Sequence, residues 1–233
     1  MIPPPRSEAE LMQRAEALVG LSLGALSDLC AQHVSTNTRL TKGKAGELVE
    51  QLLGADAGSH AEPDFRAIGV ELKTIPMRAS GLPAESTYVC RVPMAEPETE
   101  EWATSWACQK LSRVLWVGIE DEGEWHDRHV LWAKLWSPSE AELAMLQADF
   151  EEAMSLVALG RYDALTAHLG EAMQVRPKAK DGSERVTVML DSGDDVTTGP
   201  RGFYLRPTFT ARALGLVSMT TQQPVLKLPA PKE

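Results

Sequence analysis

The chain has 233 residues, of which 43% are hydrophobic and 24% charged, and its formal net charge is −10. This length fits one large domain or two small ones, and the composition is that of a globular chain rather than a disordered one. No apolar run approaches the ~20 residues of a membrane helix, and the N-terminus does not resemble a signal peptide, so we expect a cytoplasmic protein without a membrane partner. Three scattered cysteines predict reduced thiols rather than a disulfide framework.

The net charge alone argues against a nucleic-acid partner, because Lys and Arg drive phosphate binding. The charge is unevenly distributed, however: residues 1–90 carry −3, residues 91–160 carry −9 and residues 161–233 carry +2. A local basic surface is therefore compatible with the sequence, and the global charge excludes little.

Hydrophobic periodicity and capping residues predict a chain of alternating helices and strands. Helices are expected at 8–19, 23–30, from 44 to about 53, 102–111, from 137 to about 159, in a shorter segment ending at 170, and from about 208. Strands are expected at 64–74, as one strand or a bent strand pair, and at 87–92, 113–119, 129–136, 173–176, 185–190 and 202–205. This order predicts a mixed α/β domain with a central sheet. The tail from Gln222 carries three prolines and is expected to be loose.

The most unusual local pattern is Asp64 followed by Glu71-Leu72-Lys73. With the period of two of a strand, Glu71 and Lys73 share one face, opposite Val70 and Leu72. Two converging carboxylates form a hard-oxygen site that suits Mg²⁺, and the carbonyl of Leu72 could add a third ligand. Lys73 could then stabilise a hydroxide nucleophile or the charge that develops on a phosphodiester. The spacing also occurs by chance, and a solvent-facing strand edge is the ordinary interpretation.

Five blocks of sequence extend the pattern along the chain. The first contains Lys42-Gly43, Glu50, Gly54-Ala55, Ala57-Gly58-Ser59, Asp64-Phe65 and Gly69-Val70-Glu71-Leu72-Lys73-Thr74-Ile75-Pro76. The others are Lys110-Leu111-x-Arg113-Val114-Leu115-Trp116, Leu131-x5-Ser137-Pro138, Val175-Arg176-Pro177-Lys178-Ala179 and Pro200-Arg201-Gly202-Phe203-Tyr204-Leu205-x3-Phe209-Thr210. From about residue 7 to residue 216, the chain resembles the MutH family of methyl-directed mismatch-repair nicking endonucleases in block order and nearly in spacing.

The resemblance implies a restriction-endonuclease-like α/β fold, with a mixed central sheet flanked by helices and two lobes around a DNA cleft. Residues 1–221 would form a single nuclease domain with two lobes, and residues 222–233 a flexible tail. The implied activity is Mg²⁺-dependent nicking of the unmethylated strand at hemimethylated GATC sites in double-stranded DNA. One or two ions would bind, and Mn²⁺ or Ca²⁺ could occupy the same site. The enzyme would be a monomer activated by a MutL-type ATPase.

The same resemblance assigns catalytic roles. Asp64 and Glu71 would be metal ligands, and Lys73 would lie beside the attacking water. Glu50 matches an additional carboxylate of the family, contributed by the preceding helix, and Lys110 matches a lysine near the scissile phosphate. Without the resemblance, Glu50 is an ordinary solvated helix residue and Lys110 a lysine favoured at a helix end.

Two tyrosines are candidates for reading the DNA. By resemblance, Tyr204 sits against the adenine whose N6 methylation is sensed, where a methyl group would clash or displace a hydrogen bond. Tyr88 occupies a position where the family has an aromatic residue near the same base. The alternative for both is packing on a sheet with a satisfied hydroxyl.

Four basic residues complete the DNA-binding candidates. Arg176 and Lys178 flank a proline at a strand end, which suits contacts to bases or phosphates in a groove. Lys42 and Arg201 fit phosphate contacts, although surface cations are often without a specific role.

Two other functions stay open at this point. One is a type II restriction endonuclease that cuts GATC, although the chain shows one copy of the domain and no internal repeat. The other is a non-catalytic DNA-binding module with a decayed site, against which the presence of all five catalytic candidates argues.

Overall fold

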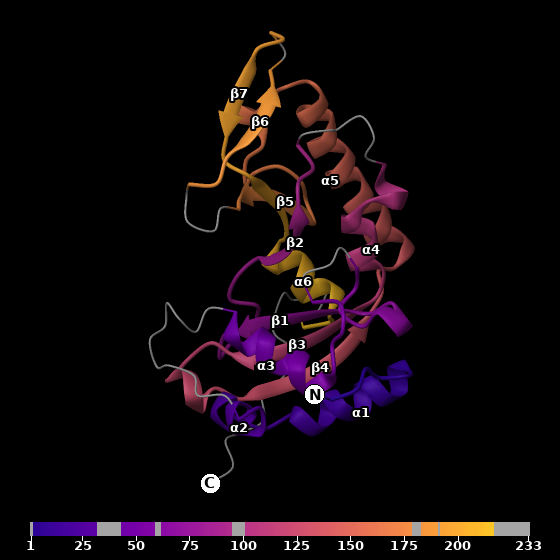
Figure 1. Cartoon of the computed structure of the whole chain (residues 1–233), viewed down its shortest axis with the longest axis vertical. Coiled ribbons are helices and arrows are strands. Elements are labelled where there is room, and N and C mark those ends of the chain that lie inside the picture. Colours follow the sequence, from indigo (N-terminus) through magenta and orange to yellow (C-terminus); the bar gives the residue numbers. More distant parts are fainter. Residues whose placement is uncertain are drawn as a thin grey trace. The chain divides into compact units, whose positions relative to one another are not determined.

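The computed structural model describes residues 2–31, 43–58, 62–94, 101–178, 183–190 and 192–216. Its elements form the predicted mixed α/β order (Figure 1). The chain divides into two compact units, each assembled from separated segments. Unit 1 comprises residues 1–85, 112–137 and 211–233, and unit 2 comprises residues 86–111 and 138–210. Among the described helices, none is both long enough and apolar enough to cross a membrane.

Unit 1 is built on a three-stranded mixed sheet in the order β1-β3-β4. The strands are β1 (Glu71–Met77), β3 (Val114–Glu120) and β4 (Val130–Trp136). β1 runs parallel to β3 and forms one edge, whereas β4 pairs antiparallel with β3. The helices are α1 (Glu8–Leu18), α2 (Leu23–Leu29) and α3 (Lys44–Leu53), with 3-10 turns η1 (Arg66–Ile68) and η4 (Trp125–Asp127).

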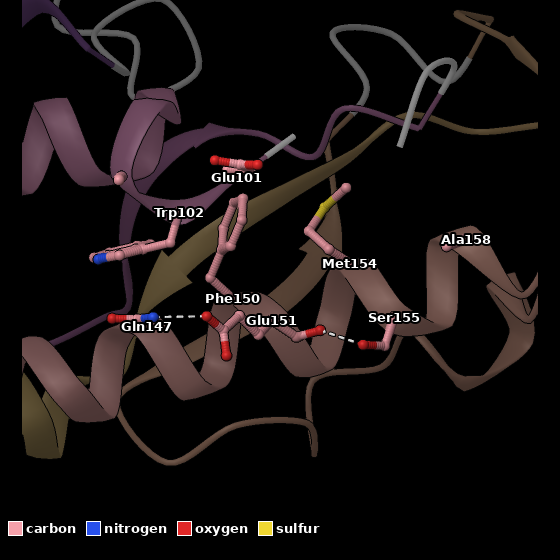
Figure 2. A pocket seen from close by; sticks show the side chains of 9 residues that line it. Glu101, Trp102, Gln147, Phe150, Glu151, Met154, Ser155 and Ala158 are labelled. Carbon is pink, nitrogen blue, oxygen red and sulfur yellow. Dashed lines mark hydrogen bonds between the residues drawn. The ribbon is translucent and has the colours of Figure 1, made fainter. Parts of the chain in front are cut away.

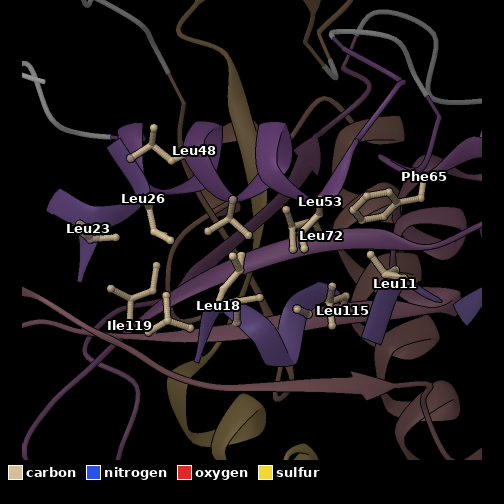
Figure 3. Packing of buried hydrophobic residues seen from close by; sticks show 14 of the residues in the cluster. Leu11, Leu18, Leu23, Leu26, Leu48, Leu53, Phe65, Leu72, Leu115 and Ile119 are labelled. Atoms are coloured by element: carbon tan, nitrogen blue, oxygen red, sulfur yellow. The ribbon is translucent and has the colours of Figure 1, made fainter. Parts of the chain in front are cut away.

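The core of unit 1 joins the apolar stripes of these helices to one face of the sheet (Figure 3). Leu48 and Leu53 of α3, Leu72 of β1 and Leu115 of β3 belong to this cluster together with Phe65, which precedes η1. Burying each such side chain contributes ~1.5–3 kcal/mol. The cluster therefore fixes α3 and the segment before β1 against the strand that carries Glu71 and Lys73.

Unit 2 is built on an antiparallel sheet in the order β2-β8-β5. Its strands are β2 (Thr87–Arg91), β8 (Arg201–Leu205) and β5 (Met173–Pro177), and a separate hairpin pairs β6 (Val186–Met189) with β7 (Asp195–Thr198). The long helix α5 (Glu140–Ala158) packs on one face of the sheet, where the rings of Phe150 and Phe203 lie 5.4 Å apart. The remaining elements are η3 (Trp102–Thr104), α4 (Trp106–Ser112) and η5 (Tyr162–Ala164) in unit 2, and α6 (Pro207–Ala213), in which the division between the two units falls after Thr210.

Three expected elements differ from the structure. Residues 64–70 form a tight turn rather than a strand, and β1 begins only at Glu71. The helix expected to end at Gly170 is only the short η5, because glycines with positive φ at 160 and 170 leave too few residues for a stable helix. The long helix α5 begins with a capping box from Ser139 to Glu142, one residue beyond Pro138.

Two further expectations have separate outcomes. The strand β7 was missed because its exposed, polar sequence lacks an apolar alternation. The single nuclease domain over residues 1–221 stays a prediction, and the tail at 222–233 lies outside the described residues.

The carboxylate of Asp149 joins α5 to the start of β5. It is only 7% exposed and accepts hydrogen bonds from the backbone N–H groups of Glu171, Ala172 and Met173 at 2.8, 2.7 and 2.7 Å. We expect Asp149→Ala to lower the free energy of unfolding by about 3 kcal/mol, because it leaves buried donors unsatisfied. Urea unfolding measures this, with the exposed Glu152→Ala on the same helix as a control that changes stability by less than ~0.5 kcal/mol. Equal losses in both variants would contradict the assignment.

Candidate functional site

A tight turn brings Asp64 to the open edge of β1. Phe65 and Val70 exchange two backbone hydrogen bonds, at 2.9 and 3.3 Å, and Gly69 supplies the positive φ of 64° that the reversal requires. The carboxylate of Asp64 then accepts a hydrogen bond from the Leu72 N–H at 2.8 Å. The six residues between Asp64 and Glu71 therefore form a turn that places the Asp64 carboxylate beside the strand that carries Glu71.

The backbone of Leu72 faces the same edge. The N–H of Glu71 donates to the carbonyl of Arg113, toward β3. Because backbone groups of successive strand residues point to opposite sides, the N–H and C=O of Leu72 point away from β3, where Asp64 lies. No described strand pairs with β1 on this side. The orientation supports the predicted use of the Leu72 carbonyl beside Asp64 as an oxygen donor.

Glu71 and Lys73 lie on one face of β1, as the period of two predicts. The Lys73 Nζ donates to Glu71 Oε1 at 2.5 Å, and the two side chains are only 12% and 2% exposed. This burial excludes the ordinary interpretation of a solvent-facing Glu beside a Lys. A carboxylate removed from water needs a cation nearby, so the position of Lys73 is tied to the charge of Glu71.

Glu50 belongs to the same electrostatic group. It lies near the C-terminal end of α3 and is partly buried. The pKa of its carboxyl is raised, first by burial and then by repulsion from Asp64, Glu47 and Glu71, while Lys73 acts in the opposite direction. Glu50 is thus not a fully solvated helix residue, and the structure brings it into interaction with Asp64, Glu71 and Lys73.

The donors at this edge suit a hard divalent cation. The candidate ligands are the carboxylates of Asp64 and Glu71 and the backbone carbonyl of Leu72, all of which are oxygens of the kind that Mg²⁺ and Ca²⁺ prefer. Within the described ranges, no three His, Cys, Asp or Glu side chains form a ready metal cluster. The fit therefore rests on two carboxylates and one carbonyl.

The DNA-binding candidates of unit 2 gather on the face of the sheet opposite α5. Tyr88 pairs directly with Tyr204, and Arg176 pairs with Gly202, so their side chains share one side. The two tyrosine rings meet edge to face at 5.3 Å. Lys178 Nζ lies 4.0 Å from the centre of the Tyr88 ring, and the Arg176 guanidinium lies 5.7 Å from that of Tyr204. We call this surface the tyrosine face. Burial raises the pKa of Tyr88 to about 12, so its hydroxyl stays protonated.

The other predicted residues are placed differently. The side chain of Arg201 points to the face of β8 opposite Tyr204. Its Nη2 donates to the carbonyl of Tyr162 at 3.2 Å, on the α5 side of the sheet. That position does not suit a phosphate contact on the tyrosine face. Lys110 lies in the last turn of α4, in unit 2. Lys42 lies outside the described residues.

Two residues of the tyrosine face were missed from the sequence. Arg91 pairs with Gly202, and a β-bulge between Tyr88 and Cys90 turns it to the same side as Tyr88. Its guanidinium forms an ion pair with Glu184 at 2.5 Å. Gln174 lies opposite Tyr204 and is 7% exposed, and its amide donates to the hydroxyl of Ser86 at 2.6 Å.

A separate hollow of about 640 Å³ lies between η3 and α5 of unit 2 (Figure 2). Trp102, Phe150 and Met154 give it an apolar lining, with the carboxylates of Glu101 and Glu151 at its rim. None of the predicted catalytic or DNA-binding residues lines it, so it is distinct from both groups of candidates.

Comparison with known proteins supports the sequence resemblance. The family model described as "DNA mismatch repair enzyme MutH" matches residues 53–149. The DNA mismatch repair proteins MutH of Shewanella sp. (strain MR-7) and of Shewanella oneidensis are each 44% identical over 218 residues, which is 92% of this chain and 97% of each relative. The corresponding protein of Shewanella baltica (strain OS195) is 43% identical over the same length.

The raised pKa of Glu50 has a consequence for stability. Its carboxyl carries a higher pKa in the folded chain than the ordinary value of 4.5, so its ionisation opposes folding of the metal-free protein above that folded pKa. We expect Glu50→Gln to raise the thermal midpoint near neutral pH, and this gain to vanish as the pH falls to about 4.5. Calorimetry across this range tests it, with the exposed Glu16→Gln on α1 as the control. A loss of stability at neutral pH would contradict the electrostatic account.

Proposed function

Because the chain belongs to the MutH family of DNA mismatch repair endonucleases, we propose that it nicks the unmethylated strand at hemimethylated GATC sites in a Mg²⁺-dependent reaction. Membership in a family of endonucleases removes the alternative of a non-catalytic module. The relatives are named as mismatch repair proteins, which favours repair over restriction. The observation that carries the proposal is the buried Glu71–Lys73 pair beside Asp64 at the open edge of β1.

In this proposal Asp64, Glu71 and the carbonyl of Leu72 hold one or two Mg²⁺ ions, a site that Mn²⁺ or Ca²⁺ could also occupy. When bound, the ion supplies an activated water and stabilises charge on the leaving oxygen. The Lys73 ammonium, which pairs with Glu71 in the free protein, orients the attacking water and offsets negative charge on the phosphate. Glu50, whose pKa is raised by burial and by the neighbouring carboxylates, is suited to exchange a proton. Lys110 contacts the scissile phosphate.

The tyrosine face reads the DNA in this proposal. Arg176 and Lys178 contact the groove or its phosphates, and Lys42 contributes a further phosphate contact. Tyr204 lies against the adenine, with Tyr88 near the same base. An added N6 methyl group would displace a hydrogen bond or collide with the ring, a loss on the order of 1–3 kcal/mol.

The charge distribution supports a recruited enzyme. The chain carries a net charge of −10, and residues 91–160 account for −9 of it. Binding to DNA is therefore expected to be weak and sensitive to salt. We propose a monomer in the cytoplasm that a MutL-type ATPase recruits and activates.

The catalytic assignment predicts a large loss of nicking on removal of Glu71. With Mg²⁺ and a hemimethylated GATC duplex, Glu71→Ala should slow nicking by about 10³-fold or more, because both a metal ligand and the partner of Lys73 are lost. Rates on labelled strands of unmethylated, hemimethylated and fully methylated duplexes measure activity and site choice together. The exposed Glu152→Ala serves as the control. Equal rates for wild type and Glu71→Ala, or double-strand breaks without a partner, would contradict the proposal.

The DNA-binding assignment predicts a change in salt dependence. Lys178→Gln should weaken binding and reduce the slope of log K against log salt by ~0.9, the amount expected for one phosphate contact. Fluorescence anisotropy with a GATC duplex and Ca²⁺ at several salt concentrations gives the slope. Arg161→Gln replaces an exposed cation beyond the C-terminus of α5 and should leave the slope unchanged. Matching slopes for wild type and Lys178→Gln would remove Lys178 from the interface.

A further inference from the structure

Gly202 lies within β8 for a reason other than backbone conformation. A glycine weakens a strand interior unless something must approach the backbone closely. Gly202 is absent from the glycines with positive φ, so other residues could adopt its backbone geometry. A Cβ placed there would lie 2.9 Å from Cε2 of Tyr88, 3.2 Å from Cε2 of Tyr204 and 3.3 Å from the carbonyl oxygen of Cys90. Because Gly202 has no side chain, both tyrosine rings can pack close to the backbone at this position.

A buried polar contact lies beside Tyr204, on the side of it away from Gly202. Gln174 lies directly across from Tyr204 on β5, whereas Ser86 immediately precedes β2 on the other side of β8. Their hydrogen bond of 2.6 Å therefore crosses β8 on the tyrosine face. Because Thr87 pairs with Leu205, this bridge crosses on the C-terminal side of Tyr204, away from Gly202. A buried amide held in this way cannot move without losing its partner.

From these two contacts we infer that Gly202 and the Gln174–Ser86 hydrogen bond are positioning elements that fix the Tyr88–Tyr204 ring pair and thereby set the discrimination against N6-methylated adenine. Gly202 leaves room for the two rings beside the backbone, and the Gln174–Ser86 hydrogen bond holds the rings in that position. The inference rests on the proposed role of Tyr204 in sensing the methyl group, and it adds the residues that determine where that ring stands.

The geometry explains why such positioning matters. Discriminating one methyl group requires a ring held to within a fraction of an ångström, because a small displacement restores the room that the methyl needs. The edge-to-face contact at 5.3 Å couples the two rings, so a shift of the Tyr88 ring also changes the packing of the Tyr204 ring. A side chain at position 202 would press on both rings and on the backbone at Cys90 at once.

The first test replaces Gly202. The readout is the ratio of nicking rates on the unmethylated and the methylated strand of GATC duplexes, measured with Mg²⁺ on the full chain. Gly202→Ala should lower this ratio by tenfold or more. Gly199→Ala is the matched control, because a Cβ at Gly199 has no neighbour within 4 Å, and it should keep the wild-type ratio.

The second test removes the bridge and keeps the proposal falsifiable if Gly202→Ala does not fold. Gln174→Met and Ser86→Ala should each lower the ratio about three- to tenfold, while Ser86→Thr, which keeps the hydroxyl, retains it. The double variant Gln174→Met/Ser86→Ala should lose no more than either single variant, because both remove the same hydrogen bond. A purely structural role would lower the thermal midpoint and leave the ratio unchanged.

The outcomes separate this inference from the proposed function. If the wild type discriminates and the folded Gln174 and Ser86 variants discriminate equally well, the positioning role is overturned and the proposed function stands. If the wild type nicks methylated and unmethylated strands at the same rate, the methyl-sensing role of Tyr204 fails, and this inference fails with it. A lowered ratio in the folded variants together with an unchanged ratio in Gly199→Ala supports it.

Discussion

The hydrogen bond from the Leu72 N–H to the Asp64 carboxylate is the contact on which the candidate catalytic site depends. It can form only because β1 is an edge strand, whose outward N–H groups have no neighbouring strand in the described part of the chain. It also requires the reversal at Gly69, which returns the chain from Phe65 to Val70 within a few residues. Phe65 anchors that turn in the core of unit 1. The packing of Phe65, the turn at Gly69 and the open edge of β1 thus together place Asp64 beside Glu71 and Lys73.

The same arrangement concentrates negative charge where water is largely excluded. Glu71 is almost completely buried, and its described cationic partner is Lys73. Asp64 and Glu71 both raise the pKa of Glu50, while Lys73 acts in the opposite direction. Repulsion of Glu50 by these carboxylates costs stability in the metal-free protein, and a divalent cation would relieve it. The cost is consistent with a site selected for chemistry rather than for folding.

Strand periodicity predicted much of this site, and it failed where the backbone departs from a regular strand. The alternation placed Glu71 and Lys73 on one face because β1 is regular there. It could not predict the turn at residues 64–70, since the positive φ of Gly69 and the pairing of Phe65 with Val70 leave no periodic signal. Arg91 was missed for a related reason. Three residues after Tyr88, it would lie on the opposite face of a regular strand, and the bulge returns it to the tyrosine face.

Every cation of the tyrosine face already has a partner in the free protein, which changes the meaning of the acidic net charge. Lys178 and Arg176 lie against the rings of Tyr88 and Tyr204, whereas Arg91 is bound to Glu184. A contact with an aromatic ring does not neutralise a cation, because the ring carries no net negative charge. An ion pair with a carboxylate does neutralise it, so in the proposed complex DNA would have to displace Glu184 from Arg91. In the proposed DNA complex, we therefore expect affinity to depend on the local pairing of cations on this face more than on the net charge of −10.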